Sequence, residues 1–130
     1  MKTECTLKVR SYECDSYNHV NNANYLHYLE YARYEFLKDA GFDYEKATKA
    51  GYGLYVARIE INYKKPAFTD DNLVIKSSPV KKGAVSGVIM QEISRGDEIL
   101  VEAKVTWAFV DSKGMPVKIP AEWDVPGLKP

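Results

Sequence analysis

Residues 23–40 of this 130-residue chain, ANYLHYLEYARYEFLKDA, decide its fold. Apolar and aromatic side chains recur there at helical spacing, at positions 25, 28, 29, 32, 36 and 40. Asn21 or Asn22 suits the N-cap of this helix, and Gly41 suits the residue that follows its last turn. Because apolar residues occupy most of the helix circumference, we expect the helix to be covered on most sides.

The segments on either side of the helix show the alternation typical of β-strands. One strand is predicted at 6–14, and four more at 55–64, 73–80, 84–94 and 99–110. The apolar face of the second predicted strand comprises Tyr55, Ala57, Ile59, Ile61 and Tyr63. Short links between the later strands make neighbours antiparallel. We therefore predict one α+β domain over residues 1–130, with a five-stranded antiparallel sheet around a long central helix and an irregular surface tail after Pro116.

The charge of the chain is balanced, with 18 basic and 18 acidic side chains. This balance argues against binding to nucleic acid or to an anionic membrane, because both depend on a long-range positive field. The first residues lack the apolar core of a signal peptide, and no run approaches the roughly 18 apolar residues of a membrane span. We therefore expect a cytoplasmic protein in which Cys5 and Cys14, on opposite faces of one predicted strand, form no disulfide.

A dense group of polar side chains precedes the helix: Asp15, Ser16, Asn18, His19, Asn21, Asn22 and Asn24. Taken singly, each is typical of a turn or a helix cap. Their position allows a second interpretation, because a carboxylate there lies near unpaired backbone N–H groups and the positive end of the helix dipole. Such N–H groups can stabilise an oxyanion, so this group is a candidate catalytic site.

The stretch from Asp15 to Arg33 resembles the D-x-x-x-H-V-N-N-x-x-Y-x-x-Y-x-E-x-A-R signature of hotdog-fold acyl-CoA thioesterases of the 4-hydroxybenzoyl-CoA thioesterase-like type. Weaker similarity continues in YKKPA at 63–67 and in D-x-x-G-x-P at 111–116. One position differs, because Asn18 stands where many relatives have glycine. The resemblance implies a hotdog fold and an enzyme that hydrolyses acyl thioesters.

The resemblance also assigns roles to residues of this site. Asp15 is the implied catalytic carboxylate, acting as nucleophile or as general base, and the Asn22 amide N–H polarises the thioester carbonyl. His19 either orients Asp15 or a water molecule, or simply holds the turn together. The further substrate-binding candidates are Asn18, Tyr25 and Tyr28, with core or interface packing as the alternative for the two tyrosines.

The implied partners are an acyl-CoA or acyl-ACP substrate and further copies of the chain. Active sites would lie at the interface of a homodimer or homotetramer, and no cofactor is needed beyond the coenzyme A of the substrate. Basic side chains near the entrance would bind the coenzyme A phosphates. The candidates are the doublets Lys64–Lys65 and Lys81–Lys82, whose alternative interpretation is as solvated strand ends.

Hydrolysis of a thioester requires only a few catalytic groups. An aspartate is ionised at neutral pH, and a thiol with a pKa near 8.5 leaves without a strong general acid. An amine leaving from an amide would need such an acid. One carboxylate and one oxyanion donor are therefore sufficient for a thioesterase, whose alternative is a non-catalytic acyl-thioester-binding protein of the same fold.

Other candidates are weaker. His19 and His27 lack the companions of a zinc site. Cys14 is expected to point away from Asp15 along a strand. Ser86 misses the G-x-S-x-G pattern and lies in a predicted strand. Glu30 and Arg33 are close enough on the helix to pair with each other.

Overall fold

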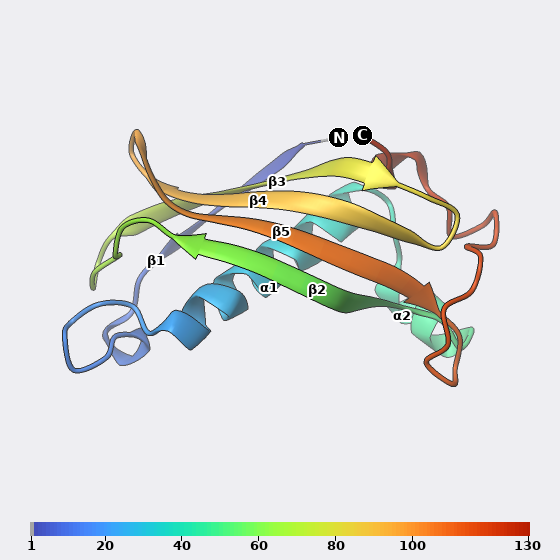
Figure 1. Cartoon of the computed structure of the whole chain (residues 1–130), viewed down its shortest axis with the longest axis horizontal. Helices are drawn as coiled ribbons and strands as arrows, with labels where there is room; N and C mark the ends of the chain where they lie inside the picture. The colour runs from blue at the N-terminus through green and yellow to red at the C-terminus, as the bar shows by residue number, and fades with distance from the viewer. Residues whose placement is uncertain (1) are drawn as a thin grey trace.

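A computed structural model describes residues 2–130. Its elements in chain order are β1 (Thr3–Lys8), a 3-10 turn (Ser11–Glu13), α1 (Asn22–Asp39), α2 (Tyr44–Lys49), β2 (Gly53–Tyr63), β3 (Asn72–Lys82), β4 (Ser86–Arg95), β5 (Glu98–Val110) and a second 3-10 turn (Pro126–Leu128). The strands form one antiparallel sheet in the order β1-β3-β4-β5-β2. Helix α1 crosses one face of this sheet, and β2 forms a free edge (Figure 1). The predicted α+β arrangement is therefore confirmed.

Helix α1 begins and ends where the sequence predicts. The Asn21 side chain accepts a 2.9 Å hydrogen bond from the Ala23 N–H, which makes Asn21 the N-cap. Gly41 has a φ of 88° just past the helix, a conformation that costs glycine little. The described helices include none that is long and apolar enough to cross a membrane.

Only one side of α1 is buried, so the prediction that it is covered on most sides is wrong for a single chain. Leu29 and Phe36 are fully buried against the sheet. Tyr31 and Tyr34, on the other side, are 48% and 47% exposed. The sheet curves under the helix and does not wrap around it, which leaves an aromatic surface open.

The core falls into two hydrophobic clusters, one under each half of α1. A buried polar group lies beneath the middle of the helix. There the Gln91 amide donates to the Leu29 carbonyl and to the Ser77 hydroxyl, each at 3.0 Å. Arg33 donates to the Gln91 side-chain oxygen at 3.2 Å. These bonds satisfy the amide of Gln91, which is fully buried.

Two strand predictions need correction. Residues 11–13 of the predicted strand 6–14 form a 3-10 turn, because the Glu13 carboxylate accepts from the Arg10 N–H at 2.8 Å and closes the chain on itself. In β2, a register shift between Val56 and Arg58 places Val56 opposite Trp107. This irregularity removes Tyr55 from the predicted apolar face, since Val56 now continues the face of Ile59.

The C-terminal tail is also more ordered than predicted. Ile119, Trp123 and Leu128 are buried in the second hydrophobic cluster. Their partners include Phe42 and Ala47, the latter in the short helix α2, which the sequence analysis did not predict. The tail therefore packs over the end of the core instead of lying loosely on the surface.

Candidate active site

A tight loop presents the Asp15 carboxylate. The Asp15 N–H donates to the His19 carbonyl at 2.7 Å, and the Asn18 N–H donates to the Asp15 carbonyl at 3.0 Å. Asn18 closes this loop with a φ of 64°, which asparagine tolerates better than most residues. The Tyr17 N–H donates to Asp15 Oδ1 at 2.9 Å and orients the carboxylate. Asp15 Oδ2 has no hydrogen-bond partner within residues 2–130, and the residue is exposed.

Glu13 joins this loop to the helix. Its carboxylate is buried and accepts from the Tyr28 hydroxyl at 2.9 Å and from the Arg10 guanidinium at 2.8 Å. Burial raises the pKa of Glu13, but the hydrogen bonds from Arg10 and Tyr28 outweigh it and the net shift is downward. The Glu13 carbonyl also accepts from the Asn21 N–H and from the Asn24 side chain, both at 2.8 Å. Sequence reasoning missed Glu13, because its partner Tyr28 becomes adjacent to it only once the chain folds.

A cavity of about 240 Å³ lies between this loop and the start of α1. Its lining comprises Asp15, His19, Val20, Asn22, Tyr25, Tyr63, Lys64, Lys65 and Pro66. The Asn22 N–H, in the first turn of α1, has no partner in the described part of the chain. A carboxylate and an unused N–H at the positive end of a helix therefore share one cavity.

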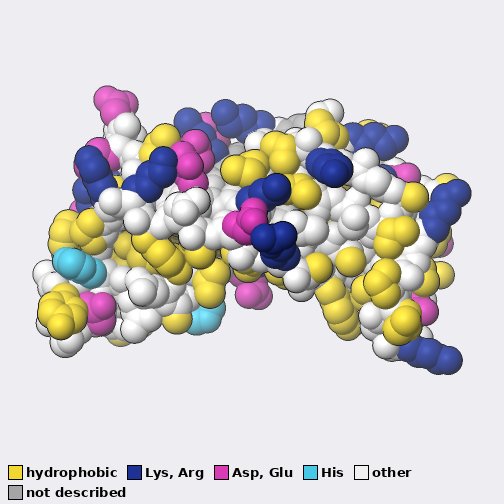
Figure 2. Space-filling model, in the orientation of Figure 1, with side chains coloured by type: hydrophobic (Ala, Val, Ile, Leu, Met, Phe, Trp, Pro, Cys, Tyr) yellow, Lys and Arg dark blue, Asp and Glu magenta, His cyan; other side chains and the backbone are white. Residues whose placement is uncertain are grey.

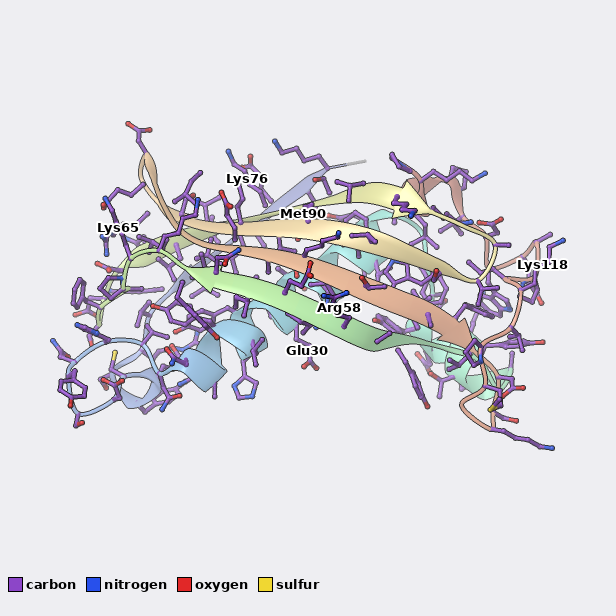
Figure 3. All side chains as sticks on the ribbon, in the orientation of Figure 1. Glu30, Arg58, Lys65, Lys76, Met90 and Lys118 are labelled. Atoms are coloured by element: carbon purple, nitrogen blue, oxygen red, sulfur yellow. The ribbon has the colours of Figure 1, made fainter. Side chains whose placement is uncertain are left out.

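Lys64 and Lys65 line the same cavity but are neutralised in part. Lys64 Nζ lies 3.1 Å from Glu102 Oε1, and Lys65 Nζ lies 2.8 Å from Glu98 Oε2. Figure 3 shows Lys65 beyond the end of β2, at the same end of the molecule as the start of α1. Hydrogen bonds from Lys65 and Arg95 lower the pKa of Glu98 to about 2, which keeps this exposed carboxylate ionised.

The second lysine doublet lies elsewhere. Lys81 and Lys82 end β3, at the end of the sheet opposite the Asp15 cavity (Figure 1). The Lys82 side chain is only 8% exposed and pairs with Asp124 of the tail at 2.7 Å. Within one chain, this doublet is therefore not brought together with Asp15.

The remaining predicted site residues differ in their surroundings. The His19 ring packs edge-on against Phe68 and makes no hydrogen bond to Asp15 in the described structure. The Tyr25 hydroxyl accepts from the Ala67 N–H at 2.9 Å, and burial raises the Tyr25 pKa. Tyr28 is buried with its hydroxyl on Glu13, and burial together with that carboxylate raises its pKa strongly. These contacts favour the packing role for Tyr28.

The weaker candidates stay apart from the cavity or are otherwise engaged. Cys14 Sγ lies 3.3 Å from the Thr69 hydroxyl, and Ser86 begins β4. The expected Glu30–Arg33 ion pair is absent among the described residues, because Arg33 turns inward to Gln91. Residues 2–130 contain no group of three or more metal-ligating side chains.

A larger groove of about 930 Å³ runs between α1 and the first half of β2. Its lining is mainly aromatic and charged: His27, Glu30, Tyr31, Arg33, Tyr34, Tyr44, Leu54, Tyr55 and Val56. Figure 2 shows hydrophobic side chains gathered along the margin of the molecule that β2 borders. The sequence placed tyrosines on the helix but gave no sign of this groove, which exists because β2 has a free edge.

Comparisons with known proteins show which family this chain resembles in sequence and in fold. Residues 9–125 match the family model described as the thioesterase-like superfamily. The chain is 36% identical over 109 residues to the long-chain acyl-CoA thioesterase FadM of Escherichia coli, covering 82% of each chain. It is 31% identical over 120 residues to the chloroplastic acyl-acyl carrier protein thioesterase ATL3 of Arabidopsis thaliana, covering 91% of this chain and 63% of that protein. A solved 4-hydroxybenzoyl CoA thioesterase, 19% identical, shares the fold with a TM-score of 0.86 over 94% of this chain and 95% of its own.

Proposed function

This chain belongs to the thioesterase-like superfamily, and on that premise we propose that it hydrolyses an acyl-CoA or acyl-ACP thioester in the cavity between Asp15 and the start of α1. The hotdog fold and the thioesterase class expected from the sequence are confirmed by this membership. The observation that carries the proposal is a single cavity lined by Asp15, which has a free carboxylate oxygen, and by Asn22, whose helix N–H is unpaired among residues 2–130.

In the proposed reaction, Asp15 acts on the thioester carbonyl carbon as nucleophile or through a water molecule as general base. As nucleophile, Asp15 Oδ2 bonds to the carbonyl carbon, the C–S bond breaks, and water then hydrolyses the resulting anhydride. As general base, Asp15 takes a proton from the water that attacks the same carbon, the C–S bond breaks, and the proton passes from Asp15 to the departing thiolate. Both routes yield a free acid and a thiol, and both regenerate the Asp15 carboxylate.

The Asn22 N–H is the proposed oxyanion donor. Negative charge develops on the thioester oxygen as the carbonyl carbon is attacked, and a fixed N–H stabilises that charge without reorganising. The helix dipole of α1 adds to this effect at its N-terminus. His19 and Tyr25 line the cavity around the reacting carbonyl, and Asn18 fixes the loop that carries Asp15.

Lys64 and Lys65 are the proposed contacts for the phosphates of the carrier, since they are the cations that line the same cavity. We also propose that the chain assembles as a homodimer, or as a homotetramer of such dimers, through the free edge of β2. Tyr55, Val56 and Tyr63 on this strand are each 45% exposed or more, which is unusual for an edge strand that stays in water. In that assembly, Lys81 and Lys82 can contribute only to the Asp15 cavity of another subunit, because within their own chain they lie at the opposite end of the sheet.

The test is turnover of a panel of aromatic and fatty acyl-CoAs, followed as free thiol. The wild-type chain is expected to release thiol, and Asp15→Asn to lose at least about 100-fold in kcat while keeping its fold. Asp39→Asn, at the exposed far end of α1, is the matched control and should keep full activity. Full activity of Asp15→Asn on the best substrate would show that the proposed mechanism is wrong.

A further inference from the structure

Glu30 and Arg33 lie one helical turn apart on α1, and both line the groove beside β2. A spacing of three residues normally lets such a pair meet on a helix surface. Here neither residue takes part in any ion pair among residues 2–130. Figure 3 shows Glu30 projecting from α1 past the free edge of β2. One open groove therefore contains an anion and a cation that form no ion pair with each other.

Arg33 is the more constrained of the two. Its guanidinium donates to Gln91, and Gln91 is fixed in turn by the Leu29 carbonyl and the Ser77 hydroxyl. This chain of hydrogen bonds directs the Arg33 guanidinium toward the buried Gln91 side chain. Burial lowers the Arg33 pKa, whereas the negative charge of Glu30 raises it without coming within ion-pair distance. Among residues 2–130, this partly buried cation therefore has no carboxylate within ion-pair distance.

We propose that Glu30 forms an ion pair with Arg33 of a second copy of this chain, and Arg33 with Glu30 of that copy, across a two-fold axis between the two α1 helices. The proposal rests on the dimer of the proposed function. A two-fold axis brings residue i to residue j and j to i, so a surface with one unpaired glutamate and one unpaired arginine is complementary to itself.

A second copy fits this groove better than the acyl chain of a substrate does. An acyl chain with a polar end would satisfy Arg33 but leave Glu30 without a partner. The groove is also bordered by Tyr31, Tyr34 and Tyr55, each about half exposed, and by a strand edge that can continue the sheet into a partner. Tyrosine is enriched at protein interfaces, where its ring is buried and its hydroxyl stays hydrated.

The test exchanges the two charges in separate chains. Glu30→Arg gives a groove with two cations, and Arg33→Glu gives one with two anions, so each homodimer is expected to weaken more than about 100-fold in dissociation constant. A 1:1 mixture of the two variants restores both pairs between chains but none within a chain. Native mass spectrometry should therefore find the mixed dimer alone. Failure of the mixture to dimerise, or dimerisation of each variant by itself, would overturn the proposal.

A second measurement covers the case in which Arg33→Glu does not fold. In a Cys5→Ser, Cys14→Ser background, chains with Glu30→Cys and chains with Arg33→Cys are mixed and oxidised. A disulfide between the two kinds of chain is expected in excess over self-linked dimers, and equal amounts would contradict the pairing. If the wild-type dimer hydrolyses acyl-CoA but neither the charge exchange nor the disulfide experiment gives the expected result, the pairing alone is refuted. If both experiments give the expected result but the dimer shows no turnover, the function alone is refuted. Altered acyl preference with an intact Arg33→Glu dimer would assign Arg33 to the substrate instead.

Discussion

The hydroxyl of Tyr28 donates a 2.9 Å hydrogen bond to the carboxylate of Glu13, two residues before Asp15. This bond joins the second turn of α1 to the loop that carries the proposed catalytic carboxylate. The same loop is bound at the Glu13 carbonyl by Asn24. The position of Asp15 relative to the Asn22 N–H thus depends on side chains that do not line the cavity beside Asp15.

Tyr28→Phe removes this one hydrogen bond and leaves the ring in place. We expect a loss of about 2 kcal/mol in the free energy of unfolding, because the acceptor is a buried carboxylate. We also expect kcat to fall several-fold with KM unchanged, as the loop loses its fixed position. Chemical denaturation and thioesterase kinetics measure the two effects. Tyr12→Phe, at a side chain that is 78% exposed, should alter neither.

Glu13→Gln should change how stability depends on pH. The folded-state pKa of Glu13 lies below its ordinary value of 4.5, so its carboxylate stabilises the fold above that value and ceases to do so as pH falls through the lowered pKa. The free energy of unfolding of the wild type is therefore expected to exceed that of Glu13→Gln most at neutral pH, with the difference narrowing as the pH falls below 4.5. Glu98 titrates in both proteins and cancels in the comparison. A constant difference across this range would show that Glu13 is not a titrating contributor.

The sequence predicted what repeats regularly or acts locally. Helical spacing located α1, and the Asn21 cap and Gly41 depend only on neighbouring residues. Prediction from the sequence failed where contacts between distant segments determine the structure. The irregularity near Val56 arises in the pairing of β2 with β5. Trp123 is buried because the tail packs on the end of the core. The residue pattern within β2 or within the tail therefore predicts neither feature.

For the candidate site too, the sequence predicted the residues that lie close together in the chain but not the contacts between distant segments. Asp15 and Asn22 are seven residues apart, so a local motif predicted that they belong to one site, and the cavity brings them together with Lys64 and Lys65. Lys82 looked equivalent to these lysines in sequence, but a partner 42 residues further on, Asp124, makes it a buried contact for the tail. The two lysine doublets are distinguished only by the topology of β3.

Asn18 tests the geometry of the Asp15 loop. Its φ of 64° costs alanine about 1 kcal/mol but costs glycine almost nothing. Asn18→Ala should therefore lower the melting temperature, whereas Asn18→Gly should leave it close to that of the wild type. Asn62→Ala, in the extended backbone of β2, provides a comparison without a positive φ. Equal melting temperatures for the alanine and glycine variants of Asn18 would contradict this loop conformation.

Gly127 tests the packing of the tail. A Cβ at this position would lie 2.6 Å from Cα and Cβ of Ala40, so either the tail or the end of α1 must move. Gly127→Ala is expected to cost about 1–3 kcal/mol in the free energy of unfolding. At Gly83 the nearest atom to a new Cβ is 3.7 Å away, so Gly83→Ala should be well tolerated. A neutral Gly127→Ala would mean that the tail is not packed against α1.

The role of Lys64 and Lys65 in binding the carrier can be separated from any role in catalysis. Each Lys→Ala change is expected to raise KM for an acyl-CoA roughly three- to tenfold, because a charge-assisted contact to phosphate is lost. The same acyl group on N-acetylcysteamine has no phosphate, so its KM should not change. Lys49→Ala removes an exposed lysine of α2 and controls for net charge. Equal losses on both thioesters would instead assign the lysines to the structure of the cavity, through their pairs with Glu102 and Glu98.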